Sequence, residues 1–285
     1  MERQYEHAVA RMAERRSVRS YREEHIPEEV LEHILQAGIN TASGGNLQPF
    51  SILVERDKAR SKKLSELLKY PFVAKADVNL LFVLDWYKLA RYSRCRQAPF
   101  VENRSTSHFF IAWDDTLLSA QAIETAAWLY GIGSCFVGHV MDCTEQLTEL
   151  YGLPEMTFPV MLLSMGYPKV MPLKSQKLQK DMIVFEGRYP ELSDAQICAA
   201  YDEKYRDRKL IMPQNETVLA NRLTAFRKAL LTTYSAEETE QIISQSLERG
   251  YLTEIQRLFG VHYHPDRELG DTLMPQLHGQ ELYPF

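Results

Sequence analysis

Three arginines and two serines stand close together near the start of the chain, within residues 15–21 (RRSVRSY). An arginine guanidinium presents a rigid fork of N–H donors that matches phosphate oxygens, and serine adds a hydroxyl donor. The formal net charge of the chain is -5, so an anion must be attracted by a local cluster and not by the field of the whole protein. The segment therefore predicts an anion site, although a solvated basic turn has the same composition.

A second polar stretch, residues 42–50 (ASGGNLQPF), combines two glycines with Ser43, Asn46 and Gln48. Glycine allows the backbone to approach a ligand closely. The three polar side chains offer donors and acceptors that match the edge of a planar heterocycle. An ordinary turn before a strand is the alternative interpretation.

Two further glycine-containing stretches follow, residues 131–138 (GIGSCFVG) and 166–168 (GYP). The first follows an apolar helix and can present backbone N–H groups to a ring, but it also fits a simple helix end. It is not a G-x-G-x-x-G between a strand and a helix, so a dinucleotide-binding fold is disfavoured. The second leads into a loop with Lys174, Lys177 and Lys180, which predicts either part of a phosphate pocket or a solvated face.

The order and spacing of these stretches resemble the nitroreductase family of FMN enzymes over residues 11–189. Residues 15–21 match the family's opening motif, Arg-Arg-Ser-x-Arg-x-Tyr/Phe, at every defined position. Residues 41–50 are similar to its second motif, with Ala42 in place of a common proline and Phe50 in place of a common tryptophan. A helix over residues 115–130, followed by Gly-Ile-Gly-Ser, resembles the family's central helix. Residues 166–168 and Tyr189 fit its closing segment.

The resemblance implies an FMN site with a role for each matched residue. Arg15, Arg16 and Ser17 would hold the phosphate and ribityl chain, and Arg19 would lie near flavin N1 and O2. Ser43, Asn46 and Gln48 would belong to the second FMN loop, from the same or the other subunit. The backbone N–H groups of Val137 and Gly138 would face flavin N5 and O4. Lys177 would occupy the place of a phosphate-binding arginine. No catalytic acid or base is assigned, because the redox chemistry belongs to the flavin.

The implied activity is NAD(P)H-driven reduction of a small-molecule electron acceptor, nitroaromatic, quinone or similar, by ping-pong hydride transfer. NADPH and NADH both remain open as the reductant, and the expected assembly is a homodimer. Two alternatives stay open. One is a specialised FMN enzyme of the same fold, such as an oxidase, a dehalogenase or a flavin-fragmenting enzyme. The other is a non-catalytic flavin-binding protein.

The elements that position these residues are expected to form an α+β fold. We expect a nitroreductase-like central mixed or antiparallel sheet surrounded by helices, in an FMN-binding domain of residues 1–189, and a helical C-terminal extension of residues 190–285. Strands are predicted at residues 50–55, 78–84, 134–140 and 158–165. Helices are predicted at residues 1–14, from 27 to about 38, 58–68, 115–130, 145–151, 193–206, 216–234 and 237–250. The first helix has an apolar face of Tyr5, Val9 and Met12. Residues 84–110 are expected to form an irregular flap, and residues 262–285 are expected to be irregular.

Composition argues against several other classes of protein. The four cysteines form no C-x-x-C pair, which favours reduced thiols over a disulfide frame or a zinc site. His262 and His264, with Asp266, are more typical of a surface loop than of a metal site, and no metal is expected. The charged N-terminal residues are unlike a secretory signal, and no apolar run reaches ~18 residues. We therefore expect a cytoplasmic protein that binds neither membrane nor nucleic acid.

Overall fold

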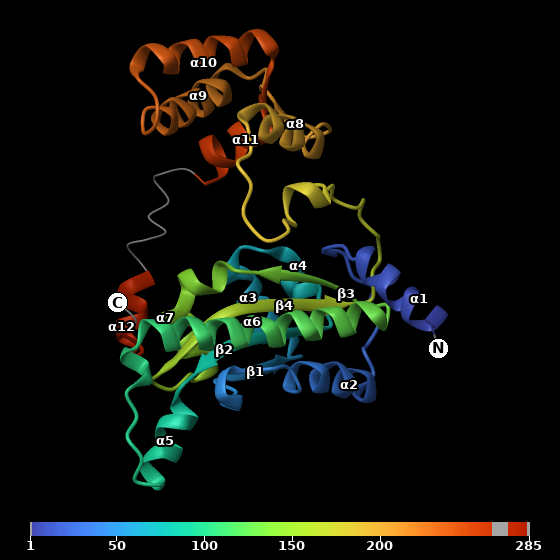
Figure 1. The fold of residues 1–285 in the computed structure, drawn as a ribbon, viewed down its shortest axis with the longest axis vertical. Coiled ribbons are helices and arrows are strands. Elements are labelled where there is room, and N and C mark those ends of the chain that lie inside the picture. The colour runs from blue at the N-terminus through green and yellow to red at the C-terminus, as the bar shows by residue number, and fades with distance from the viewer. Residues whose placement is uncertain (1, 264–272, 284–285) are drawn as a thin grey trace. The chain divides into compact units, whose positions relative to one another are not determined.

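The computed structural model describes residues 2–263 and 273–283. Two compact units make up the chain (Figure 1). The first contains the residues up to Lys174 together with the C-terminal helix α12 (Leu273–Gly279), and the second spans Ser175–Glu268. The predicted assignment of residues 1–189 to FMN binding and of residues 190–285 to an extension stays a prediction.

A four-stranded antiparallel sheet forms the centre of the first unit, in the order β1-β2-β4-β3. The strands are β1 (Phe50–Glu55), β2 (Val78–Asp85), β3 (Gly133–Val137) and β4 (Thr157–Gly166). All of β2 and nearly all of β4 is buried, which explains why both are continuous apolar runs in the sequence. The predicted α+β fold with an antiparallel sheet is confirmed.

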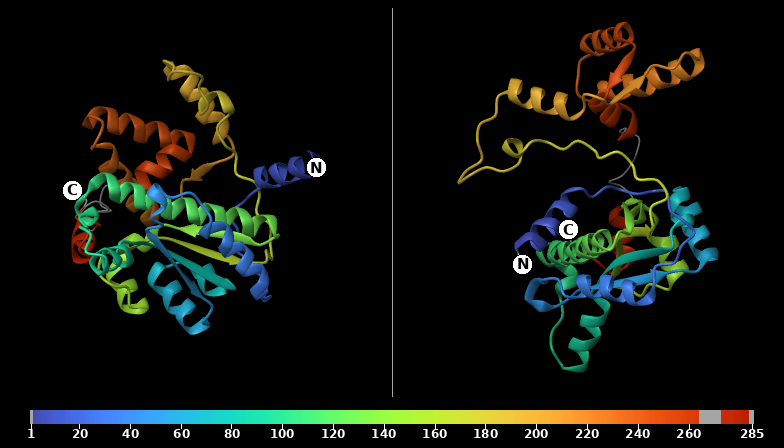
Figure 2. Two further views of the ribbon diagram at one scale, coloured as in Figure 1. Left: turned by 60° about the horizontal axis from the view of Figure 1, so that its bottom comes forward. Right: turned by 90° about the vertical axis from the view of Figure 1, so that its right-hand side faces the viewer.

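Helices cover both faces of this sheet (Figures 1 and 2). On one face lie α3 (Lys58–Leu68), α4 (Pro71–Lys75) and α7 (Thr144–Tyr151); on the other lie α2 (Glu28–Ile39) and α6 (Thr106–Leu129). Because successive strand residues point to opposite faces, Leu81 joins the first core and Leu80 the second. The central helix α6 therefore lies directly against the sheet.

The predicted irregular flap over residues 84–110 is wrong. Helix α5 (Tyr87–Cys95) occupies much of it, and α6 begins at Thr106, nine residues before the predicted start. No residue of helix α5 is fully buried, and its sequence is rich in lysine and arginine, which is typical of a polar loop. The early turns of α6 are held by contacts distant in sequence: Phe109 packs in one cluster with Phe158 and with Leu277 of α12. That helix also corrects the prediction that residues 262–285 are wholly irregular.

Helix α1 (Glu2–Ala13) forms as predicted, but its apolar face has no cover within the described chain. Tyr5 and Val9 are 64% and 65% exposed, and Met12 is also exposed. The end of the helix is anchored to α6: Arg11 Nε donates to the carbonyl of Trp128 at 3.1 Å, and the Trp128 indole N–H donates to the Arg11 carbonyl at 2.6 Å.

The second unit is mainly helical, as predicted, with one short ladder that the sequence did not predict. Its elements are α8 (Asp194–Lys204), β5 (Lys209–Ile211), α9 (Glu216–Leu230), α10 (Ala236–Arg249), β6 (Tyr251–Thr253) and α11 (Glu254–Arg257), and β5 pairs with β6. Phe226, Leu230, Ile243 and Leu252 form its core. Strands of three residues are too short to show an alternating pattern in a sequence.

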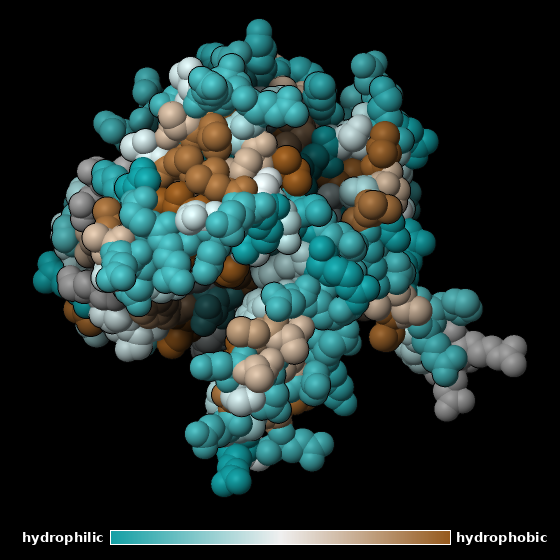
Figure 3. All heavy atoms as spheres, turned by 90° about the horizontal axis from the view of Figure 1, so that it is seen from above, coloured by the Kyte–Doolittle hydropathy of each residue, from teal (hydrophilic) through white to brown (hydrophobic). Residues whose placement is uncertain are grey.

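Figure 3 shows one face of the molecule, on which apolar patches lie among hydrophilic side chains. None of the described helices is both long enough and apolar enough to span a membrane. The described cysteines Cys95, Cys135, Cys143 and Cys198 are all free. Of the proposed surface histidine cluster, His264 and Asp266 lie outside the described residues.

Candidate functional site

The arginine-rich segment lies along the edge strand β3. Val18 N–H donates to the carbonyl of Ser134 at 2.8 Å, and Ser17 forms a bridge with Ser134. At the other end of the segment, the hydroxyl of buried Tyr21 lies 2.7 Å from the Val18 carbonyl, and Tyr21 bridges to Pro168. Three of the four predicted stretches, residues 15–21, 131–138 and 166–168, are therefore in direct contact.

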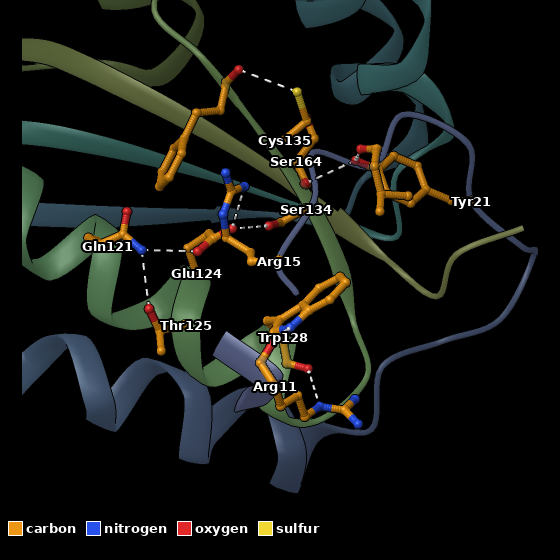
Figure 4. A network of polar contacts seen from close by, with 12 residues as sticks. Arg11, Arg15, Tyr21, Gln121, Glu124, Thr125, Trp128, Ser134, Cys135 and Ser164 are labelled. Carbon is orange, nitrogen blue, oxygen red and sulfur yellow. Dashed lines mark hydrogen bonds and ion pairs between the residues drawn. The ribbon is translucent and has the colours of Figure 1, made fainter. Parts of the chain in front are cut away.

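Arg15 is held by a carboxylate at the base of this segment (Figure 4). Its Nη1 atom lies 3.1 Å from Oε1 of Glu124 on α6, and the Glu124 side chain is only 1% exposed. The same carboxylate accepts the Ser134 hydroxyl at 3.3 Å and the Gln121 amide at 3.0 Å. A buried charge needs such partners, because an unpaired one costs several kcal/mol.

Arg16 points to a second group of charges. Its Nη1 donates to the carbonyl of Pro172 at 2.8 Å, and its Nη2 lies 3.3 Å from Glu14, which also accepts Lys174 Nζ at 2.8 Å. The hydrogen bonds from Lys174 and Arg16 lower the pKa of Glu14. Arg16 Nε is buried and has no acceptor among the residues that the structure describes. An unsatisfied guanidinium donor beside a lysine fits a phosphate oxygen.

Arg19 differs from the other two arginines of the segment, because no carboxylate of the described residues pairs with it. Its guanidinium carbon lies 6.0 Å from the centroid of the Phe72 ring. It also faces Cys135: burial raises the pKa of this thiol, and the nearby Arg19 charge opposes the rise. Arg19 is the arginine of the segment that is available to an anionic group.

The loop that carries Ser43, Asn46 and Gln48 contacts the N-terminal half of α6, whereas Glu124 lies in its C-terminal half. Buried Asp115 accepts the Gly44 N–H through both carboxylate oxygens, at 3.1 and 3.0 Å. The backbone then turns through positive φ at Gly45, Asn46 and Gln48 (58°, 55° and 48°), a conformation that glycine and asparagine tolerate best. The Ser43 hydroxyl accepts the Gln48 N–H at 3.1 Å, and exposed Asn46 directs no side-chain hydrogen bond to the described chain.

The loop of Ser43 and the arginine segment contact α6 at separate places. The loop contacts α6 at Asp115 and the arginine segment contacts it at Glu124. Nine residues of helix correspond to ~13 Å and two and a half turns, so the contacts lie on opposite sides of α6. Val137 ends β3, the strand along which the arginine segment lies, and Gly138 follows it. Lys177 belongs to the second unit, and its role stays a prediction.

A cavity of about 550 Å³ opens beside the central helix α6. Its volume is within the range of small-molecule sites. The lining is mostly apolar and comes from α6, β3 and β4; it includes Leu117, Leu118, Gln121, Phe136 and Met161. Gln121 connects the cavity to the charged network, because it also donates to Glu124. The arrangement suits a flat aromatic ring that carries polar atoms at one edge.

Sequence reasoning missed three residues of this site: Glu124, Gln121 and Asp115. Two of them are acids buried on the apolar central helix, which is an unusual position for a carboxylate. An acid on an apolar helix is therefore a feature of the sequence that could have identified both residues as site candidates. Their partners, however, lie 109 and 71 residues away, at Arg15 and Gly44, so only the tertiary structure identifies them.

Comparison with known proteins agrees with this fold. The model of the family described as "Nitroreductase family" matches residues 12–167, which is more than half of the chain. The chain belongs to the nitroreductase family. The matched range contains the arginine segment (residues 15–21), the glycine loop (residues 42–50), α6 and the whole central sheet.

Individual relatives extend the similarity. An FMN reductase (NADPH) of Bacillus subtilis is 25% identical over 227 residues, which are 77% of this chain and 90% of that protein. A second B. subtilis protein, FMN reductase [NAD(P)H], is 29% identical over 202 residues, 69% of this chain and 80% of that protein. The solved structure of B. megaterium NfrA2 has a TM-score of 0.72 at 22% identity and covers 96% of this chain and 97% of its own. The shared fold therefore includes the residues after Tyr189.

Proposed function

We propose that this protein is an FMN-dependent NAD(P)H oxidoreductase. The observation that carries the proposal is the arginine segment along β3, with an unsatisfied buried donor on Arg16 and with a link through Glu124 and Gln121 to an apolar cavity on α6. The names of the two B. subtilis relatives, FMN reductase (NADPH) and FMN reductase [NAD(P)H], support the same cofactor and reductant. The acceptor is a small molecule, a nitroaromatic, quinone or similar compound, and the protein acts in the cytoplasm.

Each group of residues has a separate task in this proposal. Arg16 and Ser17, together with Lys174, hold the FMN phosphate, while Arg15 holds the ribityl side of the cofactor. Arg19, which has no acidic partner among the described residues, stabilises negative charge at the N1 and O2 edge. The backbone of Val137 and Gly138 faces the N5 and O4 edge. Bound FMN supplies hydride acceptance and donation, and the chain itself supplies binding, orientation and charge.

A homodimer accounts for two otherwise separate observations. The loop of Ser43, Asn46 and Gln48 lies on the far side of α6 from Arg15, so a complete site needs the loop of a second copy. Helix α1 also exposes a row of apolar side chains, Tyr5, Val9 and Met12, that a second copy would cover. Two-fold symmetry repeats both contacts, giving two equivalent sites.

Anaerobic titration tests the cofactor and the reductant together. The purified protein is expected to release FMN on denaturation, and its flavin absorbance should bleach with NADPH or NADH and recover when a nitroarene or quinone is added. A protein that releases no flavin and binds no added FMN would remove the central proposal. Bleaching without acceptor turnover would instead favour a binding protein.

The oligomeric state tests the composite site. Val9→Glu places a charge in the exposed apolar face of α1 and is expected to give a monomer that binds FMN at least tenfold more weakly. Val101→Glu is the matched control, because Val101 is 64% exposed on a loop before α6. Light scattering and FMN titration measure both variants. A Val9→Glu monomer with wild-type FMN affinity would show that one chain forms the site alone.

A further inference from the structure

We propose that Glu124 is a positioning residue that holds Arg15 and limits the positive charge beside the flavin ring, a role that rests on the FMN site proposed above. Glu124 is the buried end of a connected network (Figure 4). One of its oxygens accepts from Arg15 and Ser134, and the other accepts from Gln121. The carboxylate therefore joins the arginine segment, the edge strand β3 and the central helix.

The position of this carboxylate makes it effective. The Glu124 side chain is 1% exposed, whereas that of Arg15 is 32% exposed, so the arginine reaches from a buried anion towards the surface of the site. Gln121 donates to Glu124 and also lines the apolar cavity where the ring is proposed to lie. Charges away from water are screened weakly, so the charge of Glu124 acts on whatever occupies that cavity.

The three arginines of the segment differ in whether a carboxylate balances their positive charge. Arg15 is balanced by Glu124, and Arg16 shares Glu14 with Lys174. Arg19 has no carboxylate partner among the described residues. Reduced flavin carries more negative charge at its N1 and O2 edge than oxidised flavin, and a nearby cation favours it. Glu124 therefore keeps Arg15 from acting as a second unpaired cation, which lowers the potential of bound FMN.

Glu124→Gln tests this directly, because glutamine keeps the shape of the side chain and removes its charge. We expect reduced FMN to gain about tenfold in affinity relative to oxidised FMN, which raises the midpoint potential by ~30 mV for a two-electron couple. Anaerobic equilibration with a redox dye measures the potential of bound flavin without any turnover. An unchanged or lower potential would overturn the proposal.

Glu14→Gln is the matched control. It also removes one negative charge from a carboxylate that pairs with an arginine of the segment, but the Glu14 side chain is 54% exposed and pairs at the proposed phosphate end. We expect it to change the affinities for oxidised and reduced FMN by the same factor, so that the potential stays at the wild-type value. An equal rise in both variants would show that net charge alone, and not the buried pair, sets the potential.

A second pair of variants, Arg15→Gln with and without Glu124→Gln, tests the proposal even if Glu124→Gln alone does not fold. In Arg15→Gln, the further change Glu124→Gln removes a buried carboxylate that has lost its main partner, so the double variant has no unpaired charge in the network. We expect its ratio of reduced to oxidised FMN affinity to exceed that of Arg15→Gln by about tenfold. Equal ratios would contradict the proposal. A wild-type protein that binds no FMN would instead refute the proposed function itself.

Discussion

Arg15 Nη1 lies 3.1 Å from Glu124 Oε1, although 109 residues separate the two in the sequence. The contact fastens the segment that follows α1 to the central helix. Because Ser134 on β3 donates to the same carboxylate, one side chain fixes a loop, a helix and a strand relative to one another. The stability of the fold and the geometry of the proposed cofactor site are therefore coupled through Glu124.

Removal of Arg15 should destabilise the protein even without cofactor. In Arg15→Ala the buried Glu124 carboxylate loses its charged donor, and we expect the free energy of unfolding to fall by about 2 kcal/mol. Urea unfolding of the FMN-free protein measures the change. Arg11→Ala is the control, because Arg11 Nε donates to α6 at an uncharged carbonyl, that of Trp128, and should cost only about 1 kcal/mol. Equal losses in the two variants would contradict the special role of the buried pair.

Arg19 should contribute to FMN binding more than its neighbour Arg22. Arg19→Ala removes the arginine that has no carboxylate partner among the described residues. We expect FMN affinity to fall about ten- to a hundredfold, as for the loss of a charge-assisted hydrogen bond. Fluorescence titration of the FMN-free protein measures the dissociation constant. Arg22 pairs with Glu24 at 3.0 Å, with both side chains about half exposed, so Arg22→Ala should leave the affinity unchanged. Wild-type affinity and potential in Arg19→Ala would remove Arg19 from the site.

Asp115, which accepts the Gly44 N–H of the glycine loop, should make the free energy of unfolding depend on pH. Burial raises the pKa of Asp115, and the hydrogen bond from the Gly44 N–H only partly opposes the rise. A raised pKa means that the folded state holds this proton more tightly than the unfolded state does. Asp115 therefore costs no stability at pH values below its unfolded pKa, and it costs progressively more as the pH rises through its folded pKa.

Asp115→Asn removes this dependence. Relative to wild type, we expect the free energy of unfolding of the variant to increase as the pH rises from about 4 towards neutrality. Chemical denaturation at a series of pH values measures the difference between the two proteins. A difference that is constant with pH would show that Asp115 titrates alike in both states, and a difference that shrinks would reverse the sign of the argument.

The packing of the second unit can be tested at Gly260. A Cβ atom at this position would lie 2.3 Å from Cδ2 of Phe226, whose ring is fully buried in the core of the unit. Gly260→Ala should therefore lower the stability of this unit by about 1–3 kcal/mol through overpacking. Gly279→Ala is the control, because a Cβ there meets open space at an ordinary φ. Limited proteolysis should cut Gly260→Ala faster than the control; equal rates would show that the ring moves aside at little cost.

Local patterns were sufficient for most of the elements. The strand at residues 50–55 and the helix at residues 58–68 have their predicted bounds, because each has a clear apolar pattern and a local start signal, such as the Asp57 cap that accepts the Arg60 N–H. The sequence was less informative for α5 and for the first nine residues of α6. No residue of helix α5 is fully buried, and the first turns of α6 pack against residues that are distant in the chain.

The sequence by itself determined the family resemblance, the α+β class and the arginine, glycine-loop and central-helix segments of the proposed site, because each is written in contiguous residues. Only the tertiary structure decided which charges are paired. It set Arg15 on Glu124, left Arg19 without a carboxylate among the described residues, and put the Ser43 loop on the opposite side of α6. The physical reason is that the free energy of a buried charge depends on partners that chain folding brings within a few ångströms, and sequence spacing does not specify those partners.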